Sequence, residues 1–271
     1  MIKKSKSLLN KEGFFMKRNS LSVLFACMLV LALAVTGCSS QAKAPVVGSG
    51  QEAPYSYFKV AAINQEEPIM MRDQFLEIMG QVDGPIPYFY QEVVKFAGHH
   101  CAATAGAWSI TKKALAALYP DGQVPERGQI IIHAPGPANE WYVGVFGDIF
   151  EFITGATADS GFPGSSFGEK YNRRDLLIYP DAPSGTPPPQ MKWIWERRDT
   201  GAKVEVIYNL MLAQPPNTPD LEVLQAKIGA DDPSVTESQL KSWQKTWNQR
   251  AAFVLDNADK LAGFFHVEKL N

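Results

Sequence analysis

The reactive side chains of this sequence are concentrated in one tetrapeptide, Gly98-His99-His100-Cys101. It holds two of the four histidines and one of the three cysteines of the chain. Imidazole nitrogens and a thiolate are donors that Zn²⁺, Ni²⁺, copper and iron prefer. His99 and Cys101 can face one ion where the backbone between them is not helical, and Gly98 permits such a backbone. We therefore expect these two residues to be ligands of a transition metal ion, with zinc as one choice.

Two donors do not complete a metal site, so further ligands have to come from other positions. His100 is the nearest alternative, and His133 and Asp148 are the leading distant candidates. His266, close to the C-terminus, is expected at the surface. Two other interpretations of Cys101 stay open: it is a small buried residue beside capping histidines, or a nucleophile with a neighbouring histidine as its base.

The tetrapeptide lies where one predicted helix ends and the next begins. Apolar residues recur at helical spacing over residues 89–96 and stop at Gly98. Residues 102–118 form an alanine-rich stretch that Pro120-Asp121-Gly122 terminates. At the N-terminus of the second helix, unpaired N–H groups and the helix dipole favour a thiolate over a thiol. This position makes Cys101 a suitable metal ligand.

Behind these helices the sequence predicts several strands. Apolar runs separated by turn residues predict strands over residues 129–134, 141–146, 176–179, 191–197 and 203–208. The Asp199-Thr200-Gly201 turn predicts that the last two form a hairpin, and Asp148 is expected to cap a short helix over residues 149–154. The fold class that follows is α+β: N-terminal helices packed on a mixed β-sheet, with a long C-terminal amphipathic helix.

The C-terminal helix is expected after a proline-rich connector. From Pro233 to about residue 265, apolar residues that include Trp243 and Trp247 recur in one stripe, and Asp232 is well placed as the N-cap. We expect this stripe to pack on its own domain. A homo-oligomer or a protein partner docked on the helix is the alternative.

The first 37 residues form a predicted export signal. Lys17 and Arg18 precede a 15-residue apolar run over residues 21–35, which is shorter than the ~20 residues of a membrane-spanning helix. The run ends in the lipobox pattern Val35-Thr36-Gly37-Cys38, so we expect Cys38 to be acylated. Two acyl chains hold a protein on a lipid membrane. We therefore expect a location in the cell envelope, with the outer membrane favoured in a Gram-negative host because Ser39 follows Cys38.

Composition limits the mature chain further. Removing the six basic residues and one acidic residue of positions 1–37 from 26 and 28 leaves 20 basic and 27 acidic residues, a net charge of −7. Such a balance argues against a nucleic-acid partner. Cys27 leaves with the signal and Cys38 is lipidated, so Cys101 is the remaining thiol and no internal disulfide forms.

The predicted organisation has five parts: a signal peptide (1–37), a flexible tether (38–55), an α+β domain (56–212), a linker (213–232) and the C-terminal helix (233–271). Translation starts at Met1 or at Met16. A glycine-rich segment over residues 155–174 is expected either to cradle an anion, helped by Lys170, Arg173 and Arg174, or to be an irregular loop. In the second case the anchors of the loop are aromatic, namely Phe162, Phe167 and Tyr171.

The motif Phe96-x-Gly98-His99-x-Cys101, which opens the alanine-rich helix, resembles the Phe-His-Gly-His-x-Cys-Pro-Gly signature of the FmdE-like family, whose name comes from a component of formylmethanofuran dehydrogenase. Residues 148–157, Asp-Ile-Phe-Glu-Phe-Ile-Thr-Gly-Ala-Thr, look like that family's Asp-Ala-Ile-Gln…Thr-Gly-Cys-Thr segment, and a glycine-rich stretch follows as in the family. The resemblance covers roughly residues 85–180. It implies an α+β domain with a helix over a mixed sheet, and a metal bound through cysteine and histidine.

Three of the family's functional positions carry over to this chain: His99, Cys101 and Asp148. A site that lacks the family's other two cysteines binds a different metal, uses His100 or His133, or binds none. The resemblance implies a metal-binding protein, and the lipobox adds a membrane anchor. The metal would have a redox or Lewis-acid role, in a pocket that Trp141, Tyr142 and the glycine-rich segment would line. The alternative is a non-catalytic envelope receptor for a small molecule, or a metal-handling or interaction lipoprotein. The chain departs from the family's pattern at Ala97, Ala102, Ala103, Val145 and Ala156.

Overall fold

A computed structural model describes residues 57–140, 142–182, 190–219 and 221–271, all within one compact unit, Val47–Asn271. The expected signal peptide and tether, Cys38 with its expected lipidation, and Trp141 lie outside the described residues. No helix among the described residues is long and apolar enough to cross a membrane.

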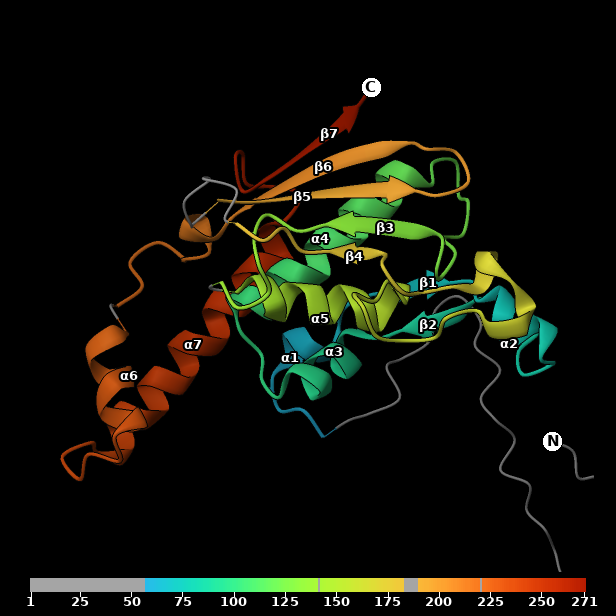
Figure 1. Cartoon of the computed structure of the whole chain (residues 1–271). Coiled ribbons are helices and arrows are strands. Elements are labelled where there is room, and N and C mark those ends of the chain that lie inside the picture. Colours follow the sequence, from blue (N-terminus) through green and yellow to red (C-terminus); the bar gives the residue numbers. More distant parts are fainter. Residues whose placement is uncertain (1–56, 141, 183–189, 220) are drawn as a thin grey trace, which may run out of the picture. The chain divides into compact units, whose positions relative to one another are not determined.

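A mixed five-stranded sheet forms one layer of the fold (Figure 1). Its strand order is β4-β3-β5-β6-β7. β3 and β4 are parallel, and the other neighbouring pairs are antiparallel. The expected hairpin around Gly201 is confirmed, since β5 and β6 pair from Gln190 with Asn209 to Glu196 with Lys203. The strands are β3 (Ile130–His133), β4 (Leu177–Ile178), β5 (Gln190–Arg197), β6 (Lys203–Asn209) and β7 (Phe265–Leu270).

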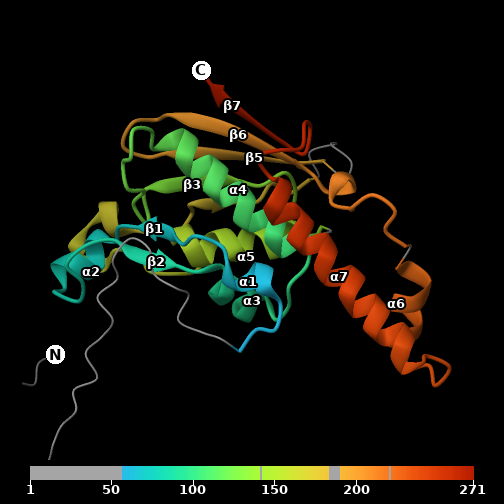
Figure 2. The same ribbon diagram turned by 180° about the vertical axis from the view of Figure 1, so that it is seen from behind.

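Helices cover one face of this sheet, and the core lies between the two layers (Figures 1 and 2). β5 alternates buried and half-buried positions, and its Trp193 and Trp195 are fully buried. Phe150 of the helical layer contacts both indoles, with ring centroids 4.8 and 4.9 Å apart. Helix α4 (Ala102–Leu118) packs against α5 (Val143–Thr154) and against β6. At Gly106, any Cβ would overlap the ring of Tyr208, so α4 can approach β6 because this residue is glycine.

The N-terminal elements pack against the helical layer and add residues such as Met71 and Tyr90 to the same core. β1 and β2 pair as an antiparallel two-stranded sheet, and α3 packs against α1, α4 and α5. The prediction of two helices flanking Gly98 is confirmed, because α3 ends at Ala97 and α4 begins at Ala102. The elements are α1 (Ala61–Asn64), β1 (Ile69–Met71), α2 (Gln74–Ile78), β2 (Ile86–Tyr88) and α3 (Tyr90–Ala97).

The predicted strand over residues 141–146 is wrong, and so is the capping role of Asp148. α5 already begins at Val143 and places Asp148 in its middle. Its buried residues recur at helical spacing: Phe146, Ile149, Phe150 and Ile153. Their burial favours a helix more strongly than the valines at 143 and 145 favour a strand. Two 3₁₀ turns occupy the glycine-rich segment after α5, η1 (Ser165–Phe167) and η2 (Glu169–Tyr171).

The C-terminal part differs from a linker followed by one helix. The segment expected as a linker contains α6 (Glu222–Gly229), after a 3₁₀ turn η3 (Leu210–Leu212). The long helix α7 covers Glu237–Asn257 and is capped by Thr236 rather than Asp232, because Thr236 and Gln239 satisfy each other's backbone N–H groups. The chain then returns as β7 at the end of the main sheet. α7 packs on α4, as expected for a helix covering its own domain.

Candidate functional site

The α3–α4 junction gives Cys101 an extended backbone at the start of α4. Gly98 adopts a left-handed conformation with φ 78°, and Cys101, with φ −150°, is the N-cap of α4. The backbone N–H of Cys101 donates to Thr104 Oγ1 at 2.9 Å, and the Thr104 N–H donates to Cys101 Sγ at 3.5 Å. The sulfur therefore takes the capping position that a serine oxygen would otherwise occupy.

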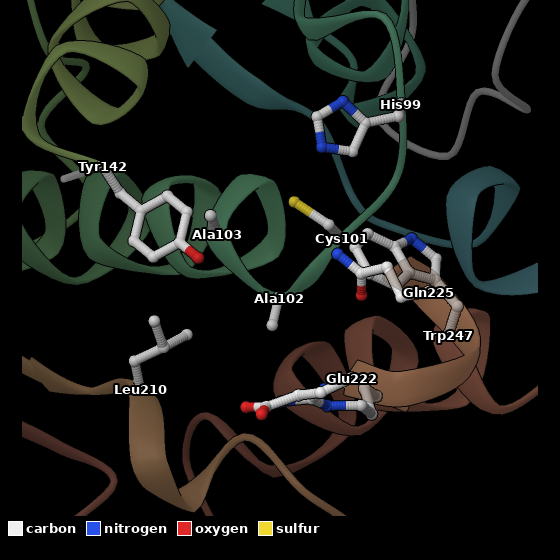
Figure 3. A pocket seen from close by; sticks show the side chains of 10 residues that line it. His99, Cys101, Ala102, Ala103, Tyr142, Leu210, Glu222, Gln225 and Trp247 are labelled. Carbon is white, nitrogen blue, oxygen red and sulfur yellow. The ribbon is translucent and has the colours of Figure 1, made fainter. Parts of the chain in front are cut away.

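His99 and Cys101 come together on the wall of a pocket of about 290 Å³. Figure 3 shows the Cys101 sulfur and the His99 ring turned toward the same space. Helix α7 borders the space with Trp247 and Arg250, and α6 borders it with Glu222. The complete lining is His99, Cys101, Ala102, Ala103, Tyr142, Leu210, Glu222, Gln225, Trp247 and Arg250.

A hydrogen bond holds the C-terminal wall against the junction. Trp247 Nε1 donates to the carbonyl oxygen of His100 at 2.7 Å, and the rings of Trp247 and Trp243 stack with centroids 5.1 Å apart. Arg250 Nε lies 3.5 Å from the carbonyl oxygen of Ala213. The pocket thus lies between the part of the chain that resembles the FmdE-like family and a C-terminal part outside that resemblance.

The side chain of His100 does not line this pocket. It is 5% exposed, and its Nδ1 lies 3.0 Å from the hydroxyl of Tyr90. Burial, with a smaller contribution from His99, lowers the pKa of His100 to about 4. Its Nε2 has no hydrogen-bond partner within the described part of the chain. Tyr90 Oη in turn lies 3.5 Å from Thr104 Oγ1, so a buried polar chain joins His100 to the cap of Cys101.

The structure does not bring the two distant candidates to Cys101. His133 ends β3, and its Nε2 lies 3.7 Å from a carboxylate oxygen of Glu196. Asp148 lines a second cavity, which shares no lining residue with the first. His266 lies exposed on β7, as expected.

The donor set at Cys101 has the chemistry of a soft metal site but not the number of ligands of a closed one. A structural zinc site uses four protein ligands and a catalytic one uses three. Among the described residues, no group of three or more histidine, cysteine, aspartate and glutamate side chains is placed to hold a metal ion. His99 and Cys101 alone therefore do not make up either kind of zinc site.

The aromatic anchors expected for the glycine-rich segment are confirmed. Phe162, Phe167 and Tyr171 surround the ring of Phe75, with centroids 4.6, 5.1 and 5.5 Å from it. Lys170 and Arg174 are used locally, over the Tyr171 ring and at the Gly161 carbonyl. Of the three basic residues, Arg173 lines the second cavity.

Comparison of the chain with family models, with curated proteins and with solved structures finds no match. The resemblance to the FmdE-like family therefore rests on the motif residues alone. Sequence reasoning missed Leu210, Glu222, Gln225 and Arg250, which are ordinary in their local context. Trp247 was visible only as a member of the amphipathic stripe.

Proposed function

We propose that this chain is a lipid-anchored protein of the cell envelope that binds a small ligand in the Cys101 pocket, with a soft transition metal ion held by His99 and Cys101. The observation that carries the proposal is the convergence of these two side chains on one pocket wall. Both residues belong to the family-like motif, and they face the cavity although the backbone between them buries His100.

The shape of the pocket supports a ligand larger than an ion. Its volume of about 290 Å³ lies near the lower end of the ~300–1,000 Å³ range of small-molecule sites. Trp247 and Tyr142 offer aromatic surface, while Arg250 and Glu222 offer opposite charges. An ion held by two protein donors keeps coordination positions that such a ligand completes.

The envelope location rests on the N-terminal sequence. The basic residues, the 15-residue apolar run and the lipobox end at Cys38. The acyl group uses the one other cysteine of the mature chain, which leaves Cys101 as the thiol available for a metal.

A second candidate is a receptor that binds a small molecule in the same pocket without a metal ion. It is favoured by the lack of a third histidine, cysteine or carboxylate ligand among the described residues. In this case Trp247, Arg250 and Glu222 would carry the recognition, and His99 and Cys101 would only line the wall.

Cobalt titration separates the two candidates, because a thiolate bound to Co²⁺ gives an intense charge-transfer absorption. The mature protein is titrated with CoCl₂ beside the variants Cys101→Ser, His99→Ala and His133→Ala. Cys101→Ser keeps a good N-cap for α4, and His133→Ala is the matched histidine control. We expect the band in the wild type and in His133→Ala, its loss in Cys101→Ser, and weaker binding in His99→Ala. A wild type without the band contradicts the metal site.

A further inference from the structure

The second cavity, of about 460 Å³, collects opposite charges that do not pair with one another. Arg127 and Arg173 line it together with Asp148 and Glu151. The two acids lie three residues apart on α5 and therefore share one face of the helix. No ion pair joins either acid to either arginine within the described residues.

The two guanidinium groups share a single buried carboxylate. The Nη2 group of Arg173 donates to both carboxylate oxygens of Asp73, at 2.8 and 2.7 Å. Asp73 also caps α2 by accepting the N–H groups of Phe75 and Leu76. Asp73 is the one carboxylate within ion-pair distance of both guanidinium groups among the described residues, so two positive charges face a single negative charge.

Arg127 carries that surplus charge. Its Nε lies 3.6 Å from Asp73 and makes no hydrogen bond in the described part of the chain, although the side chain is only 15% exposed. The guanidinium lies over the ring of Tyr88, 5.0 Å from its centroid, and next to Gly155. Burial and the neighbouring Arg173, partly offset by Asp73, lower the pKa of Arg127 to about 10. A largely buried guanidinium whose Nε lacks a hydrogen bond, and which shares its one carboxylate with a second arginine, is stabilised by a further anion.

The acidic side of the cavity has the complementary need. The side chains of Asp148 and Glu151 have no hydrogen-bond or ion-pair partner among the described residues. Burial raises the pKa of Asp148, and burial together with Asp148 raises the pKa of Glu151. Two neighbouring carboxylates without a counter-ion favour a bound cation.

Beside these charges lies an aromatic wall. The rings of Phe96 and Phe152 stack with centroids 5.3 Å apart, and Tyr88 meets Phe152 edge-on at 5.5 Å. Phe96 is 54% exposed, although it belongs to a helix whose other large residues are mostly buried. A cavity with a cationic part, an anionic part and an apolar wall fits a ligand that carries all three complements.

We propose that this second cavity binds a free α-amino acid with an apolar or aromatic side chain. Its carboxylate meets the guanidinium groups of Arg127 and Arg173, its ammonium group lies at Asp148 and Glu151, and its side chain packs on Phe96 and Phe152. The site shares no residue with the Cys101 pocket, so it stands or falls independently of the metal proposal.

Isothermal titration with three matched probes tests this site: L-phenylalanine, its N-acetyl derivative and its amide. The derivatives lack the ammonium and the carboxylate charge, respectively. A hydrogen-bonded charged contact contributes roughly 1.5–3 kcal/mol, so each derivative should bind at least about tenfold more weakly than the free amino acid. Equal binding of the three probes, or no saturable binding of phenylalanine, overturns the proposal.

Variants locate the binding in the cavity. Asp148→Asn with Glu151→Gln changes two partly exposed residues and should keep the fold, whereas Arg127→Gln alters a buried one. Both are expected to weaken phenylalanine binding by about tenfold or more, while His133→Ala, at a residue that lines neither cavity, leaves it unchanged. Unchanged affinity in the Asp148→Asn, Glu151→Gln double variant refutes the site even if Arg127→Gln fails to fold.

Discussion

The burial of His100 makes a definite prediction about how the stability of the protein depends on pH. Its ring is enclosed beside Tyr90, with Nε2 lacking a partner in the described residues, so adding a proton there costs free energy. The pKa of His100 falls from its ordinary value of 6.5 to about 4, mainly through burial. In the unfolded chain the same imidazole is solvated and has its ordinary pKa.

The sign of the effect follows from proton binding in the two states. Above pH 6.5 the side chain is neutral in both, and it adds no pH dependence. Between pH 6.5 and about 4 the unfolded chain binds a proton that the folded chain excludes. As the pH is lowered through this range, the free energy of unfolding therefore falls by about 1.4 kcal/mol per pH unit, or about 3 kcal/mol in total.

Urea unfolding at a series of pH values from 7 to 4, for the wild type and His100→Gln, measures this contribution. Carboxylates also titrate in the lower part of the range, so the quantity to compare is the difference between the two proteins. We expect the wild type to lose about 1.4 kcal/mol more per pH unit than His100→Gln below pH 6.5. The matched variant His133→Gln, at a half-exposed position, controls for the loss of a histidine as such. Parallel curves for wild type and His100→Gln would refute the buried, neutral imidazole.

Two further substitutions test the contacts that shape the Cys101 pocket and the core, each against a matched control. Trp247→Phe removes the hydrogen bond to the His100 carbonyl and should lower the free energy of unfolding by about 1 kcal/mol. The control Trp243→Phe removes an Nε1 that has no partner in the described chain, so it should not show that loss. Equal losses in the two variants would contradict the assigned hydrogen bond. Gly106→Ala places a methyl group into the Tyr208 ring and should lower the free energy of unfolding by about 1–3 kcal/mol, measured by heat or urea. The control Gly229→Ala adds a methyl group that meets no other atom, so it should be neutral or slightly stabilising. A neutral Gly106→Ala would contradict the close approach of α4 to β6.

Elements with strong local boundary signals could be predicted from the sequence. Gly98 ends α3 and Pro120 follows α4, and each acts through the backbone of its own segment. The sequence misses the first six residues of α5, 143–148, because valines at 143 and 145 favour strand locally. What decides the matter is the burial of Phe146 and Phe150 against the sheet, a long-range contact with no local signal.

Of the candidate site, the sequence predicts only the two residues that belong to the motif, His99 and Cys101. His99 and Cys101 are neighbours in sequence, and the helix junction turns both toward one space. His133 and Asp148 were chosen for their chemistry, but position in sequence does not tell which face of a strand or helix meets another element. The C-terminal wall depends on α7 docking on α4, and Arg250 and Glu222 look like ordinary surface residues until that docking is known.

X-ray absorption at the zinc edge of zinc-loaded mature protein, compared with Cys101→Ser, tests the metal proposal most directly. The wild type should show one sulfur neighbour at about 2.3 Å and imidazole scattering, with the remaining neighbours light atoms from outside the protein. The sulfur contribution should vanish in Cys101→Ser, and the imidazole contribution should fall in His99→Ala. A wild-type spectrum without sulfur, or one that Cys101→Ser leaves unchanged, would contradict a metal site at this pocket.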